Sequence, residues 1–321
     1  MWLANPMASP LLWPTAVIVG CVMGAALLGL LVKEHHAVFQ GGPRGASLSL
    51  KEWRRNELFQ RLLTWGWIAP LYTMSVLSGW LPTLLFVSVI VFQGLREYAS
   101  LAGLPKLYRW VLLCAGLLAA PAALHSTFAF YGLPALLLLG ATLQPVLAQD
   151  PKVGVRHLAF AVFGWGYLPW LLGHFMLMRL YVPGGDGLLL ALGLAVGLSD
   201  VAAFVAGKAL GRHRLAPRLS PNKTWEGVAG NFMGAALGVF LMGFALPEAL
   251  PWHFGPLLAV TIGLACAWGD LLESALKRGF QVKDAGDWLP GFGGLLDRID
   301  SLIIAVPLAY YLAKVGGLSG G

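Results

Sequence analysis

Residues 187–207 read GLLLALGLAVGLSDVAAFVAG, a stretch in which Asp200 is the only charged side chain. About 20 consecutive apolar residues in a helix cross the ~30 Å hydrocarbon layer of a bilayer. This stretch therefore predicts a membrane-spanning helix that carries one acid towards its end.

Similar apolar runs recur along the 321-residue chain, which is 58% hydrophobic and has a mean hydropathy of +0.72. We expect about ten spans, at residues 11–32, 62–78, 80–95, 108–124, 127–147, 157–179, 187–207, 227–247, 255–275 and 301–315. The fold class that follows is all-α, a polytopic integral membrane helical bundle. We divide it into N-terminal transmembrane helices, about six of them in residues 1–185, and a C-terminal transmembrane region, residues 186–321, whose polar loops are the candidates for a catalytic role.

The cationic side chains predict the orientation of the bundle. Of the 22 Lys and Arg residues, 20 fall in five connections, at 33–61, 96–109, 148–156, 208–226 and 276–300. The connections between them carry almost none. By the positive-inside rule the five basic loops and the active site face the cytoplasm, from a bacterial inner membrane. The net charge of +7 thus reflects topology and attraction to anionic membrane lipids, and we expect no nucleic acid partner.

A basic amphipathic helix is predicted in the first of these loops. Ser49 and Glu52 form a capping box, and Leu50, Trp53 and Leu58 recur at helical spacing among cations. We expect residues 49–61 to lie along the cytoplasmic membrane surface.

The loop KALGRHRLAPRLSPNKTWEG, residues 208–227, follows the Asp200 span and carries five cations. Ser220 and Pro221 predict a turn, and the hydroxyls of Ser220 and Thr224 add hydrogen-bond donors. Cations and backbone N–H groups that converge at a helix start can hold phosphates. An ordinary positive-inside loop is the alternative reading of the charge alone.

The second polar segment, SALKRGFQVKDAGDWLPGFGGLLDRIDS, runs from Ser274 to Ser301 with four carboxylates and four cations. Asp270 precedes it inside an apolar run, where a buried acid rarely survives without a cation. Asp270, Ser274 and Lys277 are spaced i, i+4, i+7 and share one helix face. Glu273, four residues before Lys277, is expected to form a helix-stabilising ion pair.

At the end of this segment Asp297 and Asp300 lie one turn apart where the last span begins. Carboxylates from two helices, with phosphate-seeking cations between them, suit Mg²⁺ that joins protein and substrate phosphates. Nucleotidyl transfer needs such neutralisation of charge at the attacked phosphorus. The alternative is structural: favourable N-terminal helix charges, and an ion pair between Asp270 and Lys277.

Residues 274–301, together with Ser220 to Gly227 and Asp200, resemble the phosphatidate cytidylyltransferases, or CDP-diacylglycerol synthases. Their signature has the form S-x-x-K-R-x(4)-K-D-x(5)-P-G-H-G-G-x-x-D-R-x-D. At matching spacing this chain has Ser274, Lys277, Arg278, Lys283, Asp284, Pro290, Gly291, Gly293, Gly294, Asp297, Arg298 and Asp300. The resemblance covers the C-terminal 120 or so residues.

The resemblance implies condensation of CTP with phosphatidic acid to CDP-diacylglycerol and pyrophosphate. It implies Mg²⁺, assisted in some members by a monovalent cation such as K⁺. The expected metal ligands are Asp270 and Asp297, with Asp200 beside them. The expected catalytic and phosphate-holding residues are Lys223, Lys277 and Arg298, completed or oriented by Asp284 and Asp300. The expected nucleotide-binding residues are Ser220, Asn222, Thr224, Lys283 and Arg278.

Two positions depart from the pattern: Phe292 replaces the usual His, and Asn222 stands where a second Lys is common. These changes also fit an enzyme acting on another lipid phosphate. A CTP-dependent polyprenol or lipid kinase and a transporter of an anionic solute are the remaining alternatives. The sequence leaves the oligomeric state open, with a homodimer as one option.

Overall fold

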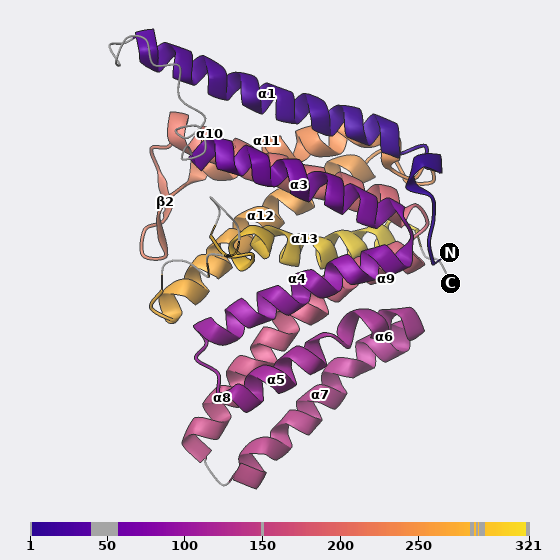
Figure 1. Ribbon diagram of the computed structural model, residues 1–321, viewed down its shortest axis with the longest axis vertical. Coiled ribbons are helices and arrows are strands. Elements are labelled where there is room, and N and C mark those ends of the chain that lie inside the picture. Colours follow the sequence, from indigo (N-terminus) through magenta and orange to yellow (C-terminus); the bar gives the residue numbers. More distant parts are fainter. Residues whose placement is uncertain are drawn as a thin grey trace.

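The computed structural model describes residues 2–39, 57–148, 151–282, 286, 288 and 293–318. Over these residues the protein is a bundle of helices with one small β-hairpin at its edge (Figure 1). The predicted all-α fold is confirmed.

The N-terminal helices are η1 (Pro6–Ala8), α1 (Leu12–Phe39), α3 (Glu57–Leu77), α4 (Trp80–Leu101), α5 (Lys106–Gly116), α6 (Ala119–His125), α7 (Thr127–Ala148), α8 (Pro151–Trp165), η2 (Gly166–Trp170) and α9 (Leu171–Tyr181). The C-terminal elements are α10 (Gly185–Leu210), β1 (Arg214–Ala216), β2 (Ser220–Thr224), α11 (Trp225–Leu241), η3 (Gly243–Ala245), α12 (Phe254–Gly279) and α13 (Leu296–Val315).

Helices occupy all ten of the predicted spans. Six helical stretches of the described chain are long and apolar enough to cross a membrane: Leu12–Gly29, Trp80–Leu101, Lys106–His125, Gly154–Tyr181, Gly185–Leu210 and Phe254–Gly279. Leu62–Leu77 and Thr127–Leu143 are shorter apolar helices, and α11 and α13 occupy the other two positions. Large apolar side chains point outwards, among them Trp67, Phe128 and Phe240, each at least 80% exposed. An outer surface of this kind is that of an integral membrane protein.

The basic connections gather on one side of the bundle, as the charge pattern predicted. In Figure 1 the end of α1, the hairpin and the end of α12 lie on the left, whereas the start of α1 and the end of α13 lie on the right. The predicted amphipathic helix at 49–61 falls largely outside the described residues, and α3 begins at Glu57.

Two local features were not predicted. Ser220 and Pro221 were expected to form a turn, but both lie in β2, and the turn is at residues 217–219. The chain from α8 to α9 is continuous through η2, a π-helical turn that contains Pro169. Proline lacks the N–H that an α-helical bond requires, and the wider turn accommodates that loss.

The core lies where α9 and α13 pack against each other and against α4 and α10. Its largest fully buried side chains include Tyr98, Phe175, Met176, Leu189 and Tyr310. Helix α13, the last span, therefore touches both the N-terminal and the C-terminal helices.

Helices α10 and α11 approach unusually closely through a stripe of glycines on α11. A Cβ added at Gly234 would lie 2.3 Å from the carbonyl oxygen of Leu198, and one at Gly238 would lie 2.4 Å from the Cα of Ala195. Gly230 makes the same kind of approach to Ala202. Small residues at four-residue spacing let membrane helices touch backbone to backbone. This contact fixes α10, and with it Asp200, against α11.

We expect Gly234→Ala to destabilise the protein, because the added methyl group would force α10 and α11 apart. Overpacking of this kind costs about 1–3 kcal/mol, which thermal unfolding in detergent would register as a lower Tm. Gly140→Ala in α7 is the matched control, since nothing lies within 4 Å of a Cβ there. Equal Tm values for the two variants would contradict the close contact.

Candidate active site

A cavity of about 1010 Å³ opens between α1, α3 and the C-terminal elements. Its charged lining residues are Asp200, Lys208, Lys223, Asp270, Glu273, Lys277, Asp297, Arg298 and Asp300. They come from α10, β2, α12 and α13, so the fold brings together side chains that are up to 100 residues apart in sequence.

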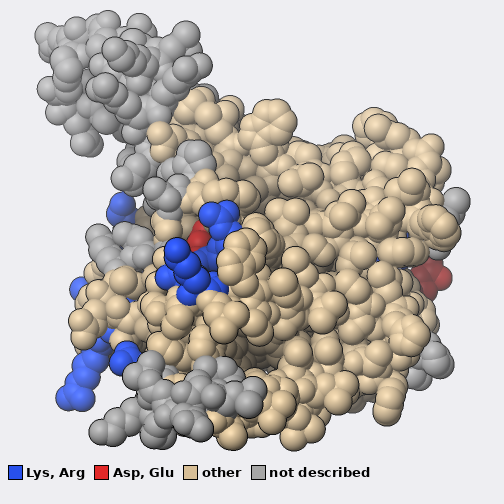
Figure 2. All heavy atoms as spheres, turned by 60° about the horizontal axis from the view of Figure 1, so that its bottom comes forward, with Lys and Arg blue, Asp and Glu red and all other residues tan. Residues whose placement is uncertain are grey.

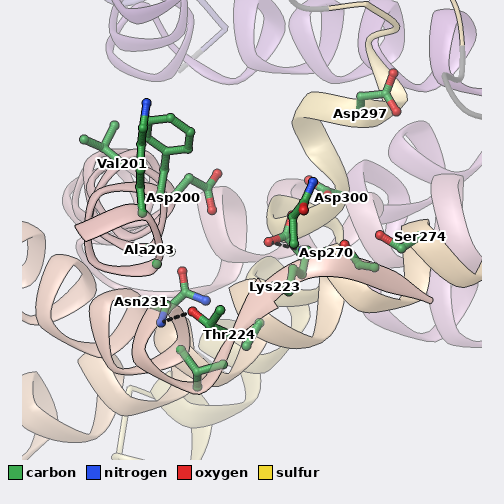
Figure 3. Close-up of a pocket in the computed structure, with 18 of the residues that line it drawn as sticks. Asp200, Val201, Ala203, Lys223, Thr224, Asn231, Asp270, Ser274, Asp297 and Asp300 are labelled. Atoms are coloured by element: carbon green, nitrogen blue, oxygen red, sulfur yellow. Dashed lines mark hydrogen bonds and ion pairs between the residues drawn. The ribbon is translucent and has the colours of Figure 1, made fainter. Parts of the chain in front are cut away.

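The first polar group in the cavity consists of Asp200, Asp270, Asp300 and Lys223. The Lys223 ammonium lies 2.5 Å from Asp270 Oδ2, and the Asp270 and Asp300 carboxyl groups interact directly. Asp200 Oδ1 accepts a hydrogen bond of 3.3 Å from the Ser301 hydroxyl. Figure 3 shows Asp270, Asp300 and Lys223 close together, with Asp200 reaching towards them from α10. Three acids from three helices therefore lie around Lys223, and the Arg298 guanidinium also offsets the charge of Asp200.

The second polar group lies around Lys277. Its ammonium contacts Glu273 Oε1 at 2.6 Å and Asp297 Oδ1 at 2.8 Å. The predicted ion pair with Glu273 is confirmed. The other Asp297 oxygen, Oδ2, accepts the Gly294 N–H at 3.0 Å. Gly293 beside it has φ +86°, a left-handed conformation that glycine adopts readily, which lets the chain turn into α13.

The hairpin positions Lys223 over the cavity. Strands β1 and β2 are antiparallel, with Arg214 opposite Thr224. The Thr224 hydroxyl accepts the Gly227 N–H at 3.1 Å and so caps α11. At the same end, Glu226 accepts a 2.7 Å hydrogen bond from the His213 ring. The hairpin and α11 are thus joined rigidly, and Lys223 is presented from a strand rather than from a loop.

The structure brings the predicted site residues of α12 and α13 to one cavity but pairs them differently from the prediction. Asp270, Ser274 and Lys277 all line the cavity, so their shared helix face is confirmed, and Asp297 and Asp300 open α13 as predicted. Figure 3 places Asp300 close to Asp270 and Asp297 farther from Asp270. The structure thus groups Asp270 with Asp300 and with the expected Asp200. It joins Asp297 to Lys277, whereas the expected metal ligands were Asp270, Asp297 and Asp200.

The predicted nucleotide-binding residues are also divided. Ser220, Asn222 and Thr224 line the cavity with Lys223. Arg278 does not line it; this side chain is exposed, and its Nε donates to the Leu219 carbonyl at 3.4 Å. Lys283, Asp284 and Phe292 lie outside the described residues.

One buried acid near the site was missed as a functional residue. Glu97 lies just after the predicted span at residues 80–95, and no sequence motif pointed to it. Its side chain is 6% exposed, and both of its oxygens accept backbone N–H groups at the start of α13. A glutamate inside an apolar run of membrane helix was the available signal.

Apolar residues line the cavity together with its charged residues. Ala26 of α1, Leu62 and Trp65 of α3, and Val201 and Phe204 of α10 form part of this lining. Figure 2 shows basic side chains gathered around an acidic one, beside a broad surface that carries no Lys, Arg, Asp or Glu. A ligand that filled the cavity would therefore meet charged groups of both signs as well as apolar groups.

Comparison with known proteins shows the family to which the chain belongs. A model described as "Cytidylyltransferase family" matches residues 59–315. The chain is 35% identical over 278 residues to the uncharacterized protein YnbB of Escherichia coli (strain K12), an alignment covering 83% of this chain and 90% of that protein. It is 31% identical over 284 residues to a phosphatidate cytidylyltransferase of Synechocystis sp., covering 76% and 92%.

A phosphatidate cytidylyltransferase of Mycobacterium leprae is 38% identical over 156 residues, and that alignment spans about half, 49%, of each protein. The family model covers most of this chain and every charged residue that lines the cavity. The chain belongs to the cytidylyltransferase family.

Proposed function

We propose that this protein transfers the CMP group of CTP to the phosphate of a membrane lipid, phosphatidic acid, with release of pyrophosphate. The observation that carries the proposal is the cavity itself, in which acids from α10, α12 and α13 and lysines from β2 and α12 meet. Family membership and the names of the relatives support it.

The charges suit two phosphorylated reactants. Lys223 and Lys277 stand about the cavity, each already held against a carboxylate, and Arg298 lies at its exposed edge. A phosphate that entered would compete with Asp270 for the Lys223 ammonium and with Asp297 for that of Lys277. Once the lysines bind the phosphates in place of these carboxylates, they stabilise the charge that develops in the transition state.

The reaction needs no general base to remove a proton from the lipid phosphate. A lipid phosphate oxygen, already ionised at neutral pH, forms a bond to the α-phosphorus of CTP. The bond from that phosphorus to the bridging oxygen of the β-phosphate breaks, and the electron pair leaves with pyrophosphate. Lys223, Lys277 and Arg298 hold the phosphates in line, which converts an encounter of two anions into a reaction within one site.

The acids suit a Mg²⁺ ion that is held partly by the protein and partly by the substrate phosphates. Among the described residues no three acidic, His or Cys side chains form a ready-made cage. Mg²⁺ usually retains waters and uses one or two carboxylates together with substrate phosphates. Asp270 and Asp300, in direct contact beside Asp200, are the carboxylates that would hold it. When bound, the ion would neutralise charge on the phosphates.

The apolar lining supports a lipid acceptor. Small and apolar residues of α1, α3 and α10 border the same cavity as the charged residues, so acyl chains could remain among apolar groups while the phosphate reaches Lys223. The basic loops on this side favour the cytoplasmic face for the reaction. The clustering of charge at one side of the bundle also disfavours transport, which calls for ionisable groups near the bilayer midplane.

Labelled CTP distinguishes this reaction from that of a lipid kinase. With phosphatidic acid and Mg²⁺, we expect purified protein to move label from [α-³²P]CTP into the lipid fraction and to move none from [γ-³²P]CTP. Thin-layer separation of the lipids measures both. Label arriving only from the γ-position would contradict the proposal and indicate a CTP-dependent kinase.

Asp300→Asn should lower the rate of CMP transfer at least about 100-fold, a magnitude typical of losing one strong transition-state contact. The substitution keeps the size of the side chain but removes the charge that faces Asp270. Asp186→Asn is the control and should retain the wild-type rate. Asp186 lies in the first turn of α10, outside the cavity. Equal rates for the two variants would remove Asp300 from the site.

Removal of divalent cations should abolish transfer. In excess EDTA we expect no labelled lipid, because the acids and the phosphates of both reactants would then repel one another. Addition of Mg²⁺ beyond the chelator should restore the wild-type rate. Undiminished transfer in EDTA would exclude a dependence on divalent metal.

A further inference from the structure

Glu97 is a buried acid that the reaction outlined above does not use. It lies near the end of α4, in the N-terminal half of the chain, and is 6% exposed. It is absent from the cavity lining. A buried carboxylate is costly unless hydrogen bonds compensate it, so its partners indicate what it does.

Both Glu97 oxygens bind the beginning of α13. Oε1 accepts the Leu295 N–H at 3.0 Å, and Oε2 accepts the Leu296 N–H at 2.8 Å. Gln93, one turn earlier on α4, donates its amide to Oε1 at 2.9 Å. Glu97 is therefore held by a side chain of its own helix and binds the N-terminus of α13, almost 200 residues away in sequence.

Helix α13 lacks a cap of the usual local kind. Its N-cap residue is Leu295, whose side chain makes no capping hydrogen bond. The first N–H groups of a helix have no partner within the helix, and a negative charge there also interacts favourably with the helix dipole. Glu97 supplies both the acceptors and the charge that a local Ser or Asp would otherwise provide.

The first turn of α13 is also where the site acids lie. Asp297 and Arg298 directly follow the two gripped residues, and Asp300 lies one turn on. Gly286, which precedes α13, approaches the Glu97 carboxylate, since a Cβ there would lie 3.3 Å from the Glu97 Cδ. Any shift of the start of α13 would therefore move Asp297 relative to Lys277 and Asp300 relative to Asp270.

We propose that Glu97 is a positioning residue for the transferase site, a cap supplied from α4 that fixes the start of α13 and thereby the carboxylates of Asp297 and Asp300. The inference rests on the proposed function. It assigns the N-terminal helices a part in the chemistry: they set the geometry of acids carried by the C-terminal region.

The test compares Glu97→Gln with Thr83→Val. Gln keeps the size of Glu97 but loses its charge and one of the two acceptors. Thr83 lies on the same helix, is fully buried and donates its hydroxyl to the Ser75 carbonyl at 2.9 Å. It precedes Glu97 by roughly 20 Å along α4, at about 1.5 Å per residue. Thr83→Val therefore controls for the loss of buried hydrogen bonds in α4.

We expect Glu97→Gln to lower the rate of CMP transfer about 10- to 100-fold, the range typical of removing a group that orients metal ligands. The Mg²⁺ concentration for half-maximal rate should rise by at least about tenfold in Glu97→Gln. In Thr83→Val this concentration should stay at the wild-type value, even if the Tm falls as much as in Glu97→Gln or more. Glu97→Leu, which removes both acceptors, should be more severe; if it does not fold, Glu97→Gln alone decides.

A second readout does not depend on activity. Mg²⁺ with CTP should raise the Tm of wild-type protein and of Thr83→Val, and should raise that of Glu97→Gln less. An unchanged Mg²⁺ requirement and an unchanged Tm response in Glu97→Gln would overturn the positioning role. Wild-type protein that moves no CMP into lipid would instead refute the proposed function, and the Tm response would then still decide whether Glu97 orders a ligand site.

Discussion

Compensation of negative charge inside the bundle is the constraint on which the rest of this structure depends. Asp200, Asp270 and Asp300 meet beside one lysine, and Glu273 and Asp297 share another. Acids at the edge of a membrane are retained only where cations or hydrogen bonds offset their cost. The protein meets that cost with lysines from a hairpin and from α12.

The helices around the cavity are arranged to hold those charges in place. The glycine stripe of α11 lets α10 approach closely, and the buried Ser199 hydroxyl on α10 donates to the Asn231 carbonyl at 3.0 Å. The start of α13 is held from the other side by Glu97. Four helices and a hairpin thus fix a small group of side chains, which is what a reaction between two anions requires.

Much of this was predictable from sequence because it is local. Apolar runs predicted the helices, helical spacing predicted the shared face of Asp270 and Lys277, and the position of Asp297 predicted the start of the last helix. Contacts between helices were not predictable in this way. The grouping of Asp270 with Asp300 and Asp200 depends on how α10, α12 and α13 cross, which no single-helix pattern contains. Glu97 was overlooked for the same reason, since its partners lie at the far end of the chain.

The account rests on the claim that one cavity receives both the triphosphate and the cation. An experimental structure of the protein with Mg²⁺ and a non-hydrolysable CTP analogue tests this most directly. We predict density for the phosphates among Lys223, Lys277 and Arg298, and for an ion at the carboxylates of Asp270 and Asp300. A nucleotide bound elsewhere on the bundle, with both lysines still paired to their acids, would contradict the account.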